Sequence, residues 1–368
     1  MIIFNALQTT LSAGIGRSSY GVAKGVYELR KIPFKIVIRE EDKELFSFAD
    51  SDDLIIAKGI TNSKKRNFYE QFVLPREVYK KYPNAIIHYP DTIAPIFAKN
   101  KVIITVNDLS FKTMRSSFTW KTAMRKNILT DISVRKASKI LTISNFAKEE
   151  VLKYYKNIDK SKIKAIHIGF DDFSKDIINE KEISQEILNI KKPFILTVST
   201  ISPRKNVDGL IKAFNVIKNE ITCNLVIAGR DGWMYEEVHK LAEELHLEDR
   251  VIFTGGINDE ELKFLYKNSK LFIYPSFYEG FGLPPLEAMS FGIPCIVSNK
   301  TSIPEVVGEA AILVDPNDID EMAKAMKNVI SDNDLYNKLV KKGFERVKVF
   351  SWNKCAENTL KIYNEYSI

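Results

Sequence analysis

The sequence predicts an α/β protein built from two doubly wound, Rossmann-like domains that face each other across a cleft. Its 368 residues exceed what one hydrophobic core usually supports. Short apolar runs alternate with helix-length segments along the whole chain, which is typical of parallel sheets with crossover helices. A polar stretch at 171–192 separates two such series. We therefore expect an N-terminal domain at 1–170, a linker at 171–192 and a C-terminal domain at 193–350.

The first domain is expected to contain strands wherever an apolar run is too short for a helix. These runs are Ile2–Phe4, Phe34–Ile38, Leu54–Ile56, Ala85–Ile87, Val102–Val106, Lys139–Ile143 and Ile163–His167. The first run lacks a basic leader and a long apolar segment, so it is interpreted as a strand and not as a signal peptide.

The second domain shows the same alternation. Its expected strands are Phe194–Val198, Asn224–Ala228, Val251–Phe253, Leu271–Tyr274, Cys295–Val297 and Ala311–Val314. Helical spacing places Leu210, Ile211, Phe214 and Ile217 on one core-facing stripe, and Ile319, Met322, Ala323 and Met326 on another. A last helix at about 351–366, within the segment 351–368, is expected to pack back on the first domain.

Charge is distributed unevenly along the chain. Residues 1–170 carry 30 Lys and Arg against 16 Asp and Glu, a net charge of +14, whereas the remainder carries 24 against 31, or −7. A basic first half favours an anionic surface or substrate near it. No RNP, helix-turn-helix or zinc-finger pattern accompanies this charge, which disfavours nucleic acid. Three widely spaced cysteines are typical of a reduced, cytoplasmic protein.

The most informative segment is Glu279–Glu287, which follows the expected strand Leu271–Tyr274. Gly280 and Gly282 allow a tight turn that brings backbone amides close to a ligand, and two prolines suit the first turn of a helix. A strand, a glycine turn and a helix N-terminus make an anion site. The two glutamates are eight residues apart, so they can meet hydroxyl groups beside the anion. The alternative is an ordinary strand–turn–helix with surface glutamates.

Two adjacent cations, Arg204 and Lys205, lie in the loop that begins at Ser199, after the first strand of the second domain. Ligands of doubly wound domains bind at this end of the strands. Arg offers two parallel donors and Lys a point charge, a pair suited to a diphosphate. A solvated surface pair is the alternative.

Weaker signals lie at three other strand ends. Gly14–Ser19 has the pattern G-x-G-x-x-S, which lacks the third glycine of a dinucleotide fingerprint, and is interpreted as a flexible loop that brings amides to a phosphate or sugar. Asn107 and Asp108 are expected to point into the cleft, with a helix cap or a turn as the alternative. Gly256 and Ile257 follow a strand and would allow a nucleobase to approach, or form a plain turn. The histidines form no metal-binding spacing, so no metal and no cofactor are expected.

Taken together, these residues resemble the retaining GT-B glycosyltransferases of glycosyltransferase family 4 over nearly the whole chain. The most specific matches are Glu279–Glu287, Arg204–Asn206, Ile227–Trp233, and Ser302–Gly308 leading to Asp315. The resemblance implies a nucleotide-sugar donor held mainly by the second domain, an acceptor held mainly by the first, and metal-independent transfer that retains the anomeric configuration.

The resemblance also implies roles for individual residues. Arg204 and Lys205 would bind the donor diphosphate with the amides of Gly280, Phe281 and Gly282, next to Leu283. Glu279 would hold the hydroxyls of the donor sugar and Glu287 the ribose. Gly14 and Gly16 would approach the phosphate, Ser199 would lie beside the donor, and Gly256 and Ile257 would touch the base. Many family members have His-Asp where this chain has Asn107-Asp108, so a different sugar or a weaker contact is implied.

The sequence identifies the donor and the acceptor less closely than it identifies the family. The pair Gly232-Trp233 looks like that of bacterial polysaccharide mannosyltransferases, which favours GDP-mannose, with a UDP or dTDP sugar as the alternative. Cations alternate with aromatics at Lys64–Arg66 and from Phe111 to Lys126, a composition that suits an anionic membrane face. We expect a cytoplasmic protein, peripheral on the inner face of the membrane, that uses a glycan or polyprenyl-diphosphate-linked acceptor.

Three other functions remain open from the sequence. A nucleotide-sugar epimerase needs acid and base carboxylates on both sides of the sugar, and only Asp108 is available in the first domain. A NAD-dependent dehydrogenase is disfavoured by the broken fingerprint at Ser19. A non-catalytic sugar-nucleotide-binding protein is disfavoured by the intact Glu279, Glu287, Arg204 and Lys205.

Overall fold

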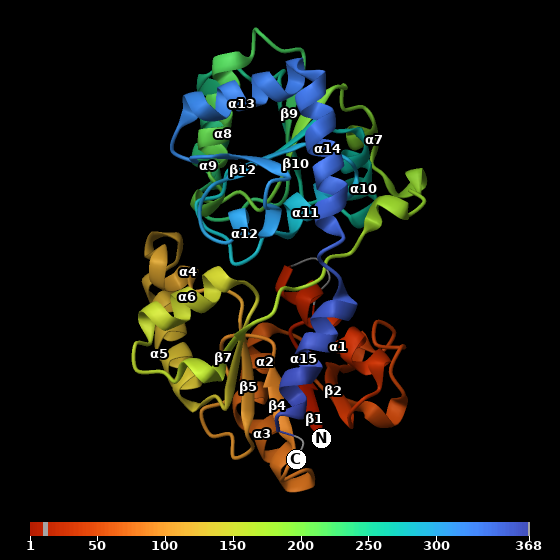
Figure 1. The fold of residues 1–368 in the computed structure, drawn as a ribbon, viewed down its shortest axis with the longest axis vertical. Coiled ribbons are helices and arrows are strands. Elements are labelled where there is room, and N and C mark those ends of the chain that lie inside the picture. The colour runs from red at the N-terminus through yellow and green to blue at the C-terminus, as the bar shows by residue number, and fades with distance from the viewer. Residues whose placement is uncertain (10–13, 367–368) are drawn as a thin grey trace. The chain divides into compact units, whose positions relative to one another are not determined.

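The computed structural model describes residues 1–9 and 14–366 and divides into two compact units (Figure 1). Unit 1 comprises Met1–Gly169 together with the C-terminal segment that begins at Phe350, and unit 2 comprises Phe170–Val349. The stretch 171–192, expected to be a linker, belongs to unit 2 and contains short helices: η6 (Phe173–Lys175), η7 (Glu180–Glu182) and α7 (Gln185–Leu188).

Unit 1 is built on a parallel sheet with the strand order β3-β2-β1-β4-β5-β6-β7. The strands are β1 (Ile2–Asn5), β2 (Phe34–Arg39), β3 (Leu54–Ala57), β4 (Ile86–Tyr89), β5 (Val102–Val106), β6 (Lys139–Thr142) and β7 (Ile163–Ala165). The strand order reverses between β1 and β4, and ligands of doubly wound folds bind at the carboxyl ends of the strands beside such a reversal.

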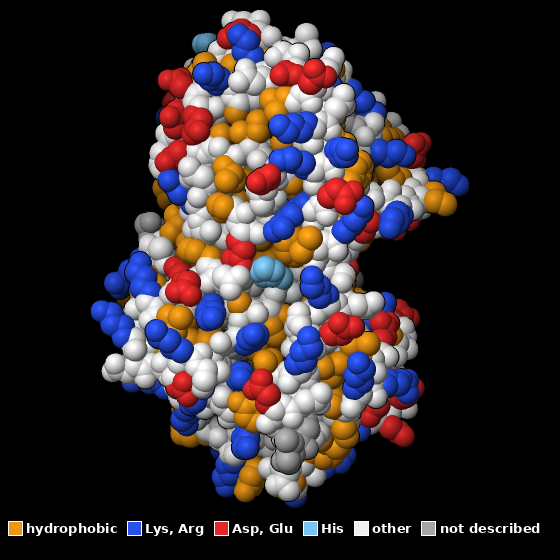
Figure 2. Space-filling model, in the orientation of Figure 1, with side chains coloured by type: hydrophobic (Ala, Val, Ile, Leu, Met, Phe, Trp, Pro, Cys, Tyr) orange, Lys and Arg blue, Asp and Glu red, His pale blue; other side chains and the backbone are white. Residues whose placement is uncertain are grey.

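Helices bury both faces of this sheet. They are α1 (Gly14–Leu29), α2 (Ser63–Phe68), the π-helical turn η3 (Tyr69–Val73), α3 (Leu74–Lys81), α4 (Ser110–Thr113), α5 (Trp120–Lys136), α6 (Asn145–Tyr154) and α15 (Trp352–Asn364), with short 3₁₀ turns η1 (Glu40–Asp42), η2 (Ser51–Asp53), η4 (Arg115–Ser117) and η5 (Lys160–Lys162). Alternate residues of β1 enter different cores: Ile3 packs with α3, α5 and α6, whereas Ile2 and Phe4 pack with α1 and α15. Figure 2 shows Lys and Arg side chains spread among apolar and acidic ones on the face of the molecule that is turned to the viewer.

The C-terminal helix α15 lies beside α1, although the two are more than 300 residues apart in the sequence (Figure 1). Glycines make this close approach possible: a Cβ on Gly21 would lie 2.4 Å from the Trp352 ring, and one on Gly25 would lie 2.9 Å from the Cβ of Ala356. One expectation from the sequence is wrong. Gly14–Ser19, expected to be a flexible loop, begins helix α1, because the small residues that this helix buries, Gly16, Ser18 and Ser19, resemble loop residues in a sequence.

A buried histidine joins the sheet of unit 1 to α15. His88 on β4 is 1% exposed, and its Nδ1 lies 2.5 Å from the Tyr363 hydroxyl while its Nε2 lies 2.8 Å from the Thr105 hydroxyl. Burial lowers the pKa of His88 from 6.5 to about 3, so the imidazole is neutral in the folded protein.

We expect His88 to make unit 1 sensitive to acid. Between about pH 6.5 and 3 the unfolded chain protonates this imidazole and the folded chain does not, so the free energy of unfolding should fall by up to about 1.4 kcal/mol per pH unit. Denaturant midpoints measured at pH 7 and pH 5 would show this loss, and His88→Gln should reduce it. The matched control is His239→Gln on the surface of unit 2; equal acid sensitivity in the wild type and in both variants would contradict the expectation.

Unit 2 is built on a second parallel sheet with the order β10-β9-β8-β11-β12-β13. Its strands are β8 (Phe194–Val198), β9 (Asn224–Ala228), β10 (Val251–Gly255), β11 (Leu271–Tyr274), β12 (Cys295–Ser298) and β13 (Ala311–Val314). Its other helices are η8 (Pro203–Lys205), α8 (Val207–Ile217), α9 (Tyr235–Glu244), α10 (Asp259–Asn268), α11 (Leu283–Ser290), α12 (Ile303–Val307), α13 (Ile319–Ser331) and α14 (Asn333–Val347).

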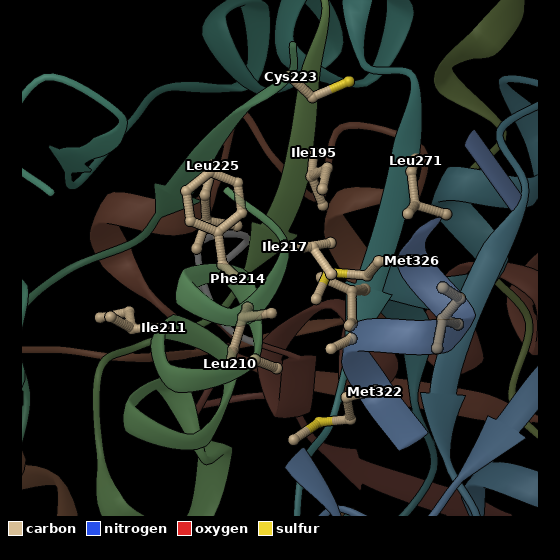
Figure 3. Packing of buried hydrophobic residues seen from close by; sticks show 14 of the residues in the cluster. Ile195, Leu210, Ile211, Phe214, Ile217, Cys223, Leu225, Leu271, Met322 and Met326 are labelled. Carbon is tan, nitrogen blue, oxygen red and sulfur yellow. The ribbon is translucent and has the colours of Figure 1, made fainter. Parts of the chain in front are cut away.

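The core between α8, α13 and this sheet contains the two stripes that the sequence predicts. Leu210, Ile211, Phe214 and Ile217 of α8 and Met322 and Met326 of α13 pack with Ile195, Leu225 and Leu271 from the strands (Figure 3). The strand predictions are confirmed in both units, with ends that differ by one or two residues, as between the expected Ala85–Ile87 and the observed β4.

Candidate functional site

The segment Glu279–Glu287 has the strand–turn–helix geometry that the sequence predicts. Strand β11 ends at Tyr274, and α11 begins at Leu283 with prolines in its first turn. Gly282 has φ +121°, a conformation that side chains rarely adopt, and a Cβ there would lie 2.8 Å from Cδ1 of Ile303. Glycine is therefore required at this position for the turn between β11 and α11.

The structure brings Arg204, Lys205 and Glu279 together at the carboxyl edge of the second sheet. Lys205 Nζ lies 2.5 Å from Glu279 Oε1 and donates to the Tyr274 hydroxyl at 2.7 Å. Arg204 Nη1 donates to the carbonyl oxygen of Tyr278 at 3.0 Å and lies 3.4 Å from Glu279 Oε2. The cations come from the β8–α8 loop and the carboxylate from the β11–α11 loop, so two neighbouring strand ends build this cluster.

The electrostatics of the cluster favour an ionised Glu279 with both cations charged. The Glu279 side chain is buried, and burial alone would raise its pKa. The charges of Lys205 and Arg204 outweigh this effect and lower the pKa below its ordinary value. The three side chains together carry a net positive charge in a largely buried place, where electrostatic attraction for an anion is stronger than in water.

Backbone and side-chain contacts hold the two loops in place. Asn206 is buried and left-handed, with φ +56°, and its Nδ2 donates to the carbonyl oxygens of Pro275 and Pro316 at 3.3 and 2.6 Å. The amide of Phe277 donates to the carbonyl oxygen of Arg204 at 2.9 Å. Asn206 therefore ties the cationic loop to the loops that follow β11 and β13.

Two further residues orient the turn of Glu279. The Glu279 amide donates to Thr301 Oγ1 at 3.1 Å, and Ser302 Oγ lies 2.8 Å from the carbonyl oxygens of both Glu279 and Phe281. Thr301 also has a positive φ of +58°. The sequence assigned no role to Asn206, Thr301 or Ser302, because only the fold reveals that these loops are neighbours.

Glu287 lies one turn into α11 and is buried. The hydroxyl of Tyr266, on α10, donates to Glu287 Oε2 at 2.9 Å. Tyr266 holds this carboxylate from the neighbouring helix, and the sequence did not identify it.

The remaining predicted residues of unit 2 lie after β8, β10 and β11. The Ser199 amide donates to the carbonyl oxygen of Ala228 at 2.9 Å. The buried hydroxyl of Ser199 has no hydrogen-bond partner among the described residues. Gly256 is exposed, and a Cβ on it would lie 2.8 Å from Cγ of Arg230. Gly280, Phe281 and Leu283 follow Glu279 in the same turn, and Ile257 follows Gly256, so these residues share the carboxyl edge with Arg204.

In unit 1, Asn107 and Asp108 follow β5, and their side chains make different contacts. Asn107 is buried, and its Nδ2 donates to the carbonyl oxygen of Pro90 at 3.3 Å. Asp108 Oδ1 accepts hydrogen bonds from the Ser110 amide at 2.8 Å and the Ser110 hydroxyl at 2.6 Å. Asp108 therefore stabilises the turn before the short helix α4, whose N-cap is Leu109 and has no side-chain capping bond, as the turn alternative expects. Gly14 is exposed and Gly16 is buried, both in the first turn of α1.

No group of three or more His, Cys, Asp and Glu side chains within 1–9 and 14–366 is arranged to hold a metal ion. Within the same ranges, no helix is both long enough and apolar enough to cross a lipid bilayer.

Comparisons with known proteins agree with this architecture. Residues 179–346 match the family model described as "Glycosyl transferases group 1". The chain is 30% identical to the O-antigen chain mannosyltransferase B of Escherichia coli over 95% of both chains, and 30% identical to the O-antigen chain mannosyltransferase RfbU of Salmonella typhimurium over 69% of both.

A crystal structure of Anabaena Alr3699/HepE, in complex with UDP and glucose, has the same fold. It superposes with a TM-score of 0.75 over 99% of both chains at 17% identity. The sequence matches, the two parallel sheets and this structural neighbour all agree with the resemblance seen in the sequence. The chain therefore belongs to the group 1 glycosyltransferases and has the GT-B fold, with mannosyltransferases among its relatives.

Proposed function

We propose that this protein transfers a hexose from a nucleotide-diphosphate sugar to a glycan or lipid-linked glycan in cell-surface polysaccharide synthesis, with retention of the anomeric configuration and without a metal. The observation that carries this proposal is the cluster of Arg204, Lys205 and Glu279 at the carboxyl edge of the second sheet. The O-antigen mannosyltransferases among the relatives support the polysaccharide assignment.

The cluster suits the chemistry of diphosphate departure. As the bond between the sugar C1 and the phosphate oxygen breaks, the electron pair leaves with the nucleoside diphosphate, which gains negative charge. Lys205 and Arg204, fixed before the reaction, stabilise that charge more in the transition state than in the ground state. In this proposal the amides of Gly280, Phe281 and Gly282 assist the cations.

The carboxylates have separate roles in this proposal. Glu279 accepts hydrogen bonds from hydroxyls of the donor sugar while Lys205 and Arg204 keep it ionised. Glu287 accepts from the ribose, beside the Tyr266 hydroxyl that already holds it. Gly256 and Ile257 lie next to the base, at the exposed end of β10.

No side chain is proposed as the main base. The acceptor hydroxyl attacks C1 on the face that the diphosphate leaves, and its proton passes to the departing phosphate oxygen, so charge and atoms balance. Asp108, which accepts two hydrogen bonds from Ser110, is engaged in local structure and suits a supporting role.

Replacing Asn107 tests whether the reaction needs the side-chain amide of Asn107 to position a substrate. We expect Asn107→Ala to leave kcat within a few-fold of wild type, because its amide donates to the Pro90 carbonyl oxygen and so serves the local structure of unit 1. Glu279→Ala should abolish turnover, since it removes the sugar contact and leaves two buried cations unpaired. Steady-state rates with a saturating donor test both; full loss in Asn107→Ala alone would assign the amide an essential role.

GDP-mannose is the proposed donor, with UDP and dTDP sugars as alternatives. The names of the O-antigen relatives support mannose, whereas the structural neighbour from Anabaena was crystallised with UDP and glucose. A thermal-shift panel of nucleotides and nucleotide sugars decides between them: a ligand at 100 times its dissociation constant should stabilise the protein by about 2.7 kcal/mol. A panel in which no nucleotide raises the melting temperature would overturn the proposed function.

The acceptor is proposed to be a glycan linked to a polyprenyl diphosphate, with the protein peripheral on the inner face of the cell membrane. Unit 1 offers basic side chains next to aromatic ones for this purpose. One such place is a shallow pocket beyond the carboxyl end of β3, lined by Lys58, Gly59, Ile60, Lys64, Lys65, Phe68 and Tyr69. Its lysines suit phosphate groups and its aromatic rings suit an apolar chain.

A further inference from the structure

Helix α5 of unit 1 carries a stripe of large apolar side chains on its solvent-facing side. Trp120, Met124 and Ile128 are 62%, 48% and 53% exposed. They are spaced four residues apart, so they form one continuous row along the helix. Single exposed apolar residues are common, but an aligned row of three large ones forms a contiguous patch, and such patches mark interaction sites.

The stripe is not a core face that lacks its cover. The opposite side of α5 is already buried through Ala123, Thr130, Ser133 and Val134. Of these, Val134 belongs to the core that contains β1, α3 and α6. The helix therefore has a buried face for its own domain and a second, exposed apolar row that its own domain does not use.

Positive charge borders the stripe. Lys121 and Arg125 are exposed next to it, and Arg135 is exposed near the end of the helix. The one acidic residue of α5, Asp131, accepts hydrogen bonds from Lys112 at 2.9 Å and from the Tyr155 hydroxyl at 2.6 Å. The exposed surface of α5 thus combines apolar and cationic groups, with its single carboxylate neutralised by neighbours.

We propose that the exposed face of α5, defined by Trp120, Lys121, Met124, Arg125 and Ile128, docks unit 1 onto an anionic lipid bilayer. Trp120, Met124 and Ile128 insert at the boundary between headgroups and acyl chains, where Trp is favoured. Lys121 and Arg125 lie against anionic headgroups. The purpose of this docking rests on the proposed function, because an enzyme that acts on a lipid-linked acceptor must reach the bilayer surface.

Charge is what favours a bilayer over a protein partner. An apolar row without charge would suit either one, whereas basic residues beside it match the negative surface of a leaflet that contains anionic lipid. A protein partner is the other outcome of the test: the purified chain would then fail to bind vesicles.

The test is vesicle co-sedimentation of the full-length protein without donor or acceptor. Wild type should bind vesicles that contain phosphatidylglycerol and bind vesicles of phosphatidylcholine alone much more weakly, and salt should weaken the binding. A variant with Trp120→Ser, Met124→Ser and Ile128→Ser should lose at least about tenfold in partitioning. Lys121→Gln with Arg125→Gln should lose mainly the preference for anionic lipid.

A matched control comes from two exposed aromatic side chains elsewhere on unit 1. Phe97 is 70% exposed and Tyr79 is 40% exposed, and Lys99 Nζ lies 5.1 Å from the centroid of the Tyr79 ring. Phe97→Ser with Tyr79→Ser removes exposed aromatic area beside a lysine and should leave vesicle binding unchanged. Loss of binding in this control, with none in the α5 variant, would move the docking surface to α3 and the loop after β4 and overturn the proposal.

Trp120 supplies a second readout. The chain has three tryptophans, so Trp120→Phe retains an apolar side chain while it removes one fluorophore. A blue shift of tryptophan emission on addition of anionic vesicles should occur in wild type and disappear in Trp120→Phe, although that variant still binds. A blue shift that persists in Trp120→Phe would show that Trp120 does not enter the bilayer.

The two proposals fail separately. The α5 variant keeps the diphosphate cluster of unit 2, so nucleotides should still raise its melting temperature as they do in wild type. Vesicle binding with no nucleotide response would overturn the proposed function and leave the docking surface standing. A nucleotide response with no vesicle binding by wild type would overturn the docking surface and leave the nucleotide-sugar transfer standing.

Discussion

Replacing Lys205 with Met is expected to lower kcat by about 10²–10³-fold, which corresponds to roughly 3–4 kcal/mol of transition-state stabilisation for a group that contacts developing negative charge. Lys205 Nζ is held by Glu279 and the Tyr274 hydroxyl before any ligand binds. Its position therefore needs no reorganisation during the reaction. Arg204→Ala should have a similar effect, because Arg204 contacts the same carboxylate from the other side.

Initial rates over a range of nucleotide-sugar concentrations give kcat, which measures this loss, and KM, which reports changes in donor binding. The matched control is Lys327→Met, which removes a lysine paired with Glu220 on the surface of unit 2; an exposed ion pair contributes only about 0–1 kcal/mol to stability, and kcat should not change. A Lys205→Met protein that melts like wild type and keeps its kcat would show that the cluster does not act on the leaving group.

Replacing Tyr363 with Ala is expected to destabilise unit 1 by about 3–5 kcal/mol, the usual cost of removing a fully buried aromatic side chain. Tyr363 is 0% exposed and packs with Phe34 and His88 in the core that α15 shares with α1. Tyr363→Phe should cost about 1–3 kcal/mol, because it leaves Nδ1 of the buried His88 without its hydroxyl partner.

Denaturant unfolding followed by tryptophan fluorescence measures both variants, since Trp352 lies on α15 against α1. Tyr79→Ala is the control: this tyrosine is 40% exposed, so its loss should change the free energy of unfolding by about 0.5 kcal/mol or less. An unchanged midpoint in Tyr363→Ala would mean that α15 contributes little to the stability of unit 1.

The strands and the core-facing helix stripes were predictable because their signals are local. Strands of a parallel sheet are buried on both faces, so they appear as short continuous apolar runs such as Phe194–Val198 and Asn224–Ala228, which the structure confirms with the same ends. The family resemblance was also predictable, because loops such as Glu279–Glu287 and Arg204–Asn206 keep a recognisable order of residue types.

Errors occurred where a local signal had more than one structural use. Glycines at Gly14 and Gly16 suggested a flexible loop, but they begin α1, a helix whose later glycines let Trp352 approach. The polar composition of 171–192 suggested a linker, yet short helices form there; the Asn179 amide donates to Glu260 and the Ser184 amide to Glu261. Polar side chains that bond across distant segments resemble solvated ones in a sequence.

By itself the sequence determined the fold class, the two strand series and the identity of the charged groups at the strand ends, since apolar periodicity and residue type are properties of neighbouring positions. Only the tertiary structure decided that Lys205 meets Glu279, that Asn206 joins three loops, that Tyr266 holds Glu287 and that Tyr363 reaches His88, 275 residues away. Such contacts depend on which strands are adjacent in a sheet and on how closely helices pack, and neither is encoded within any one segment.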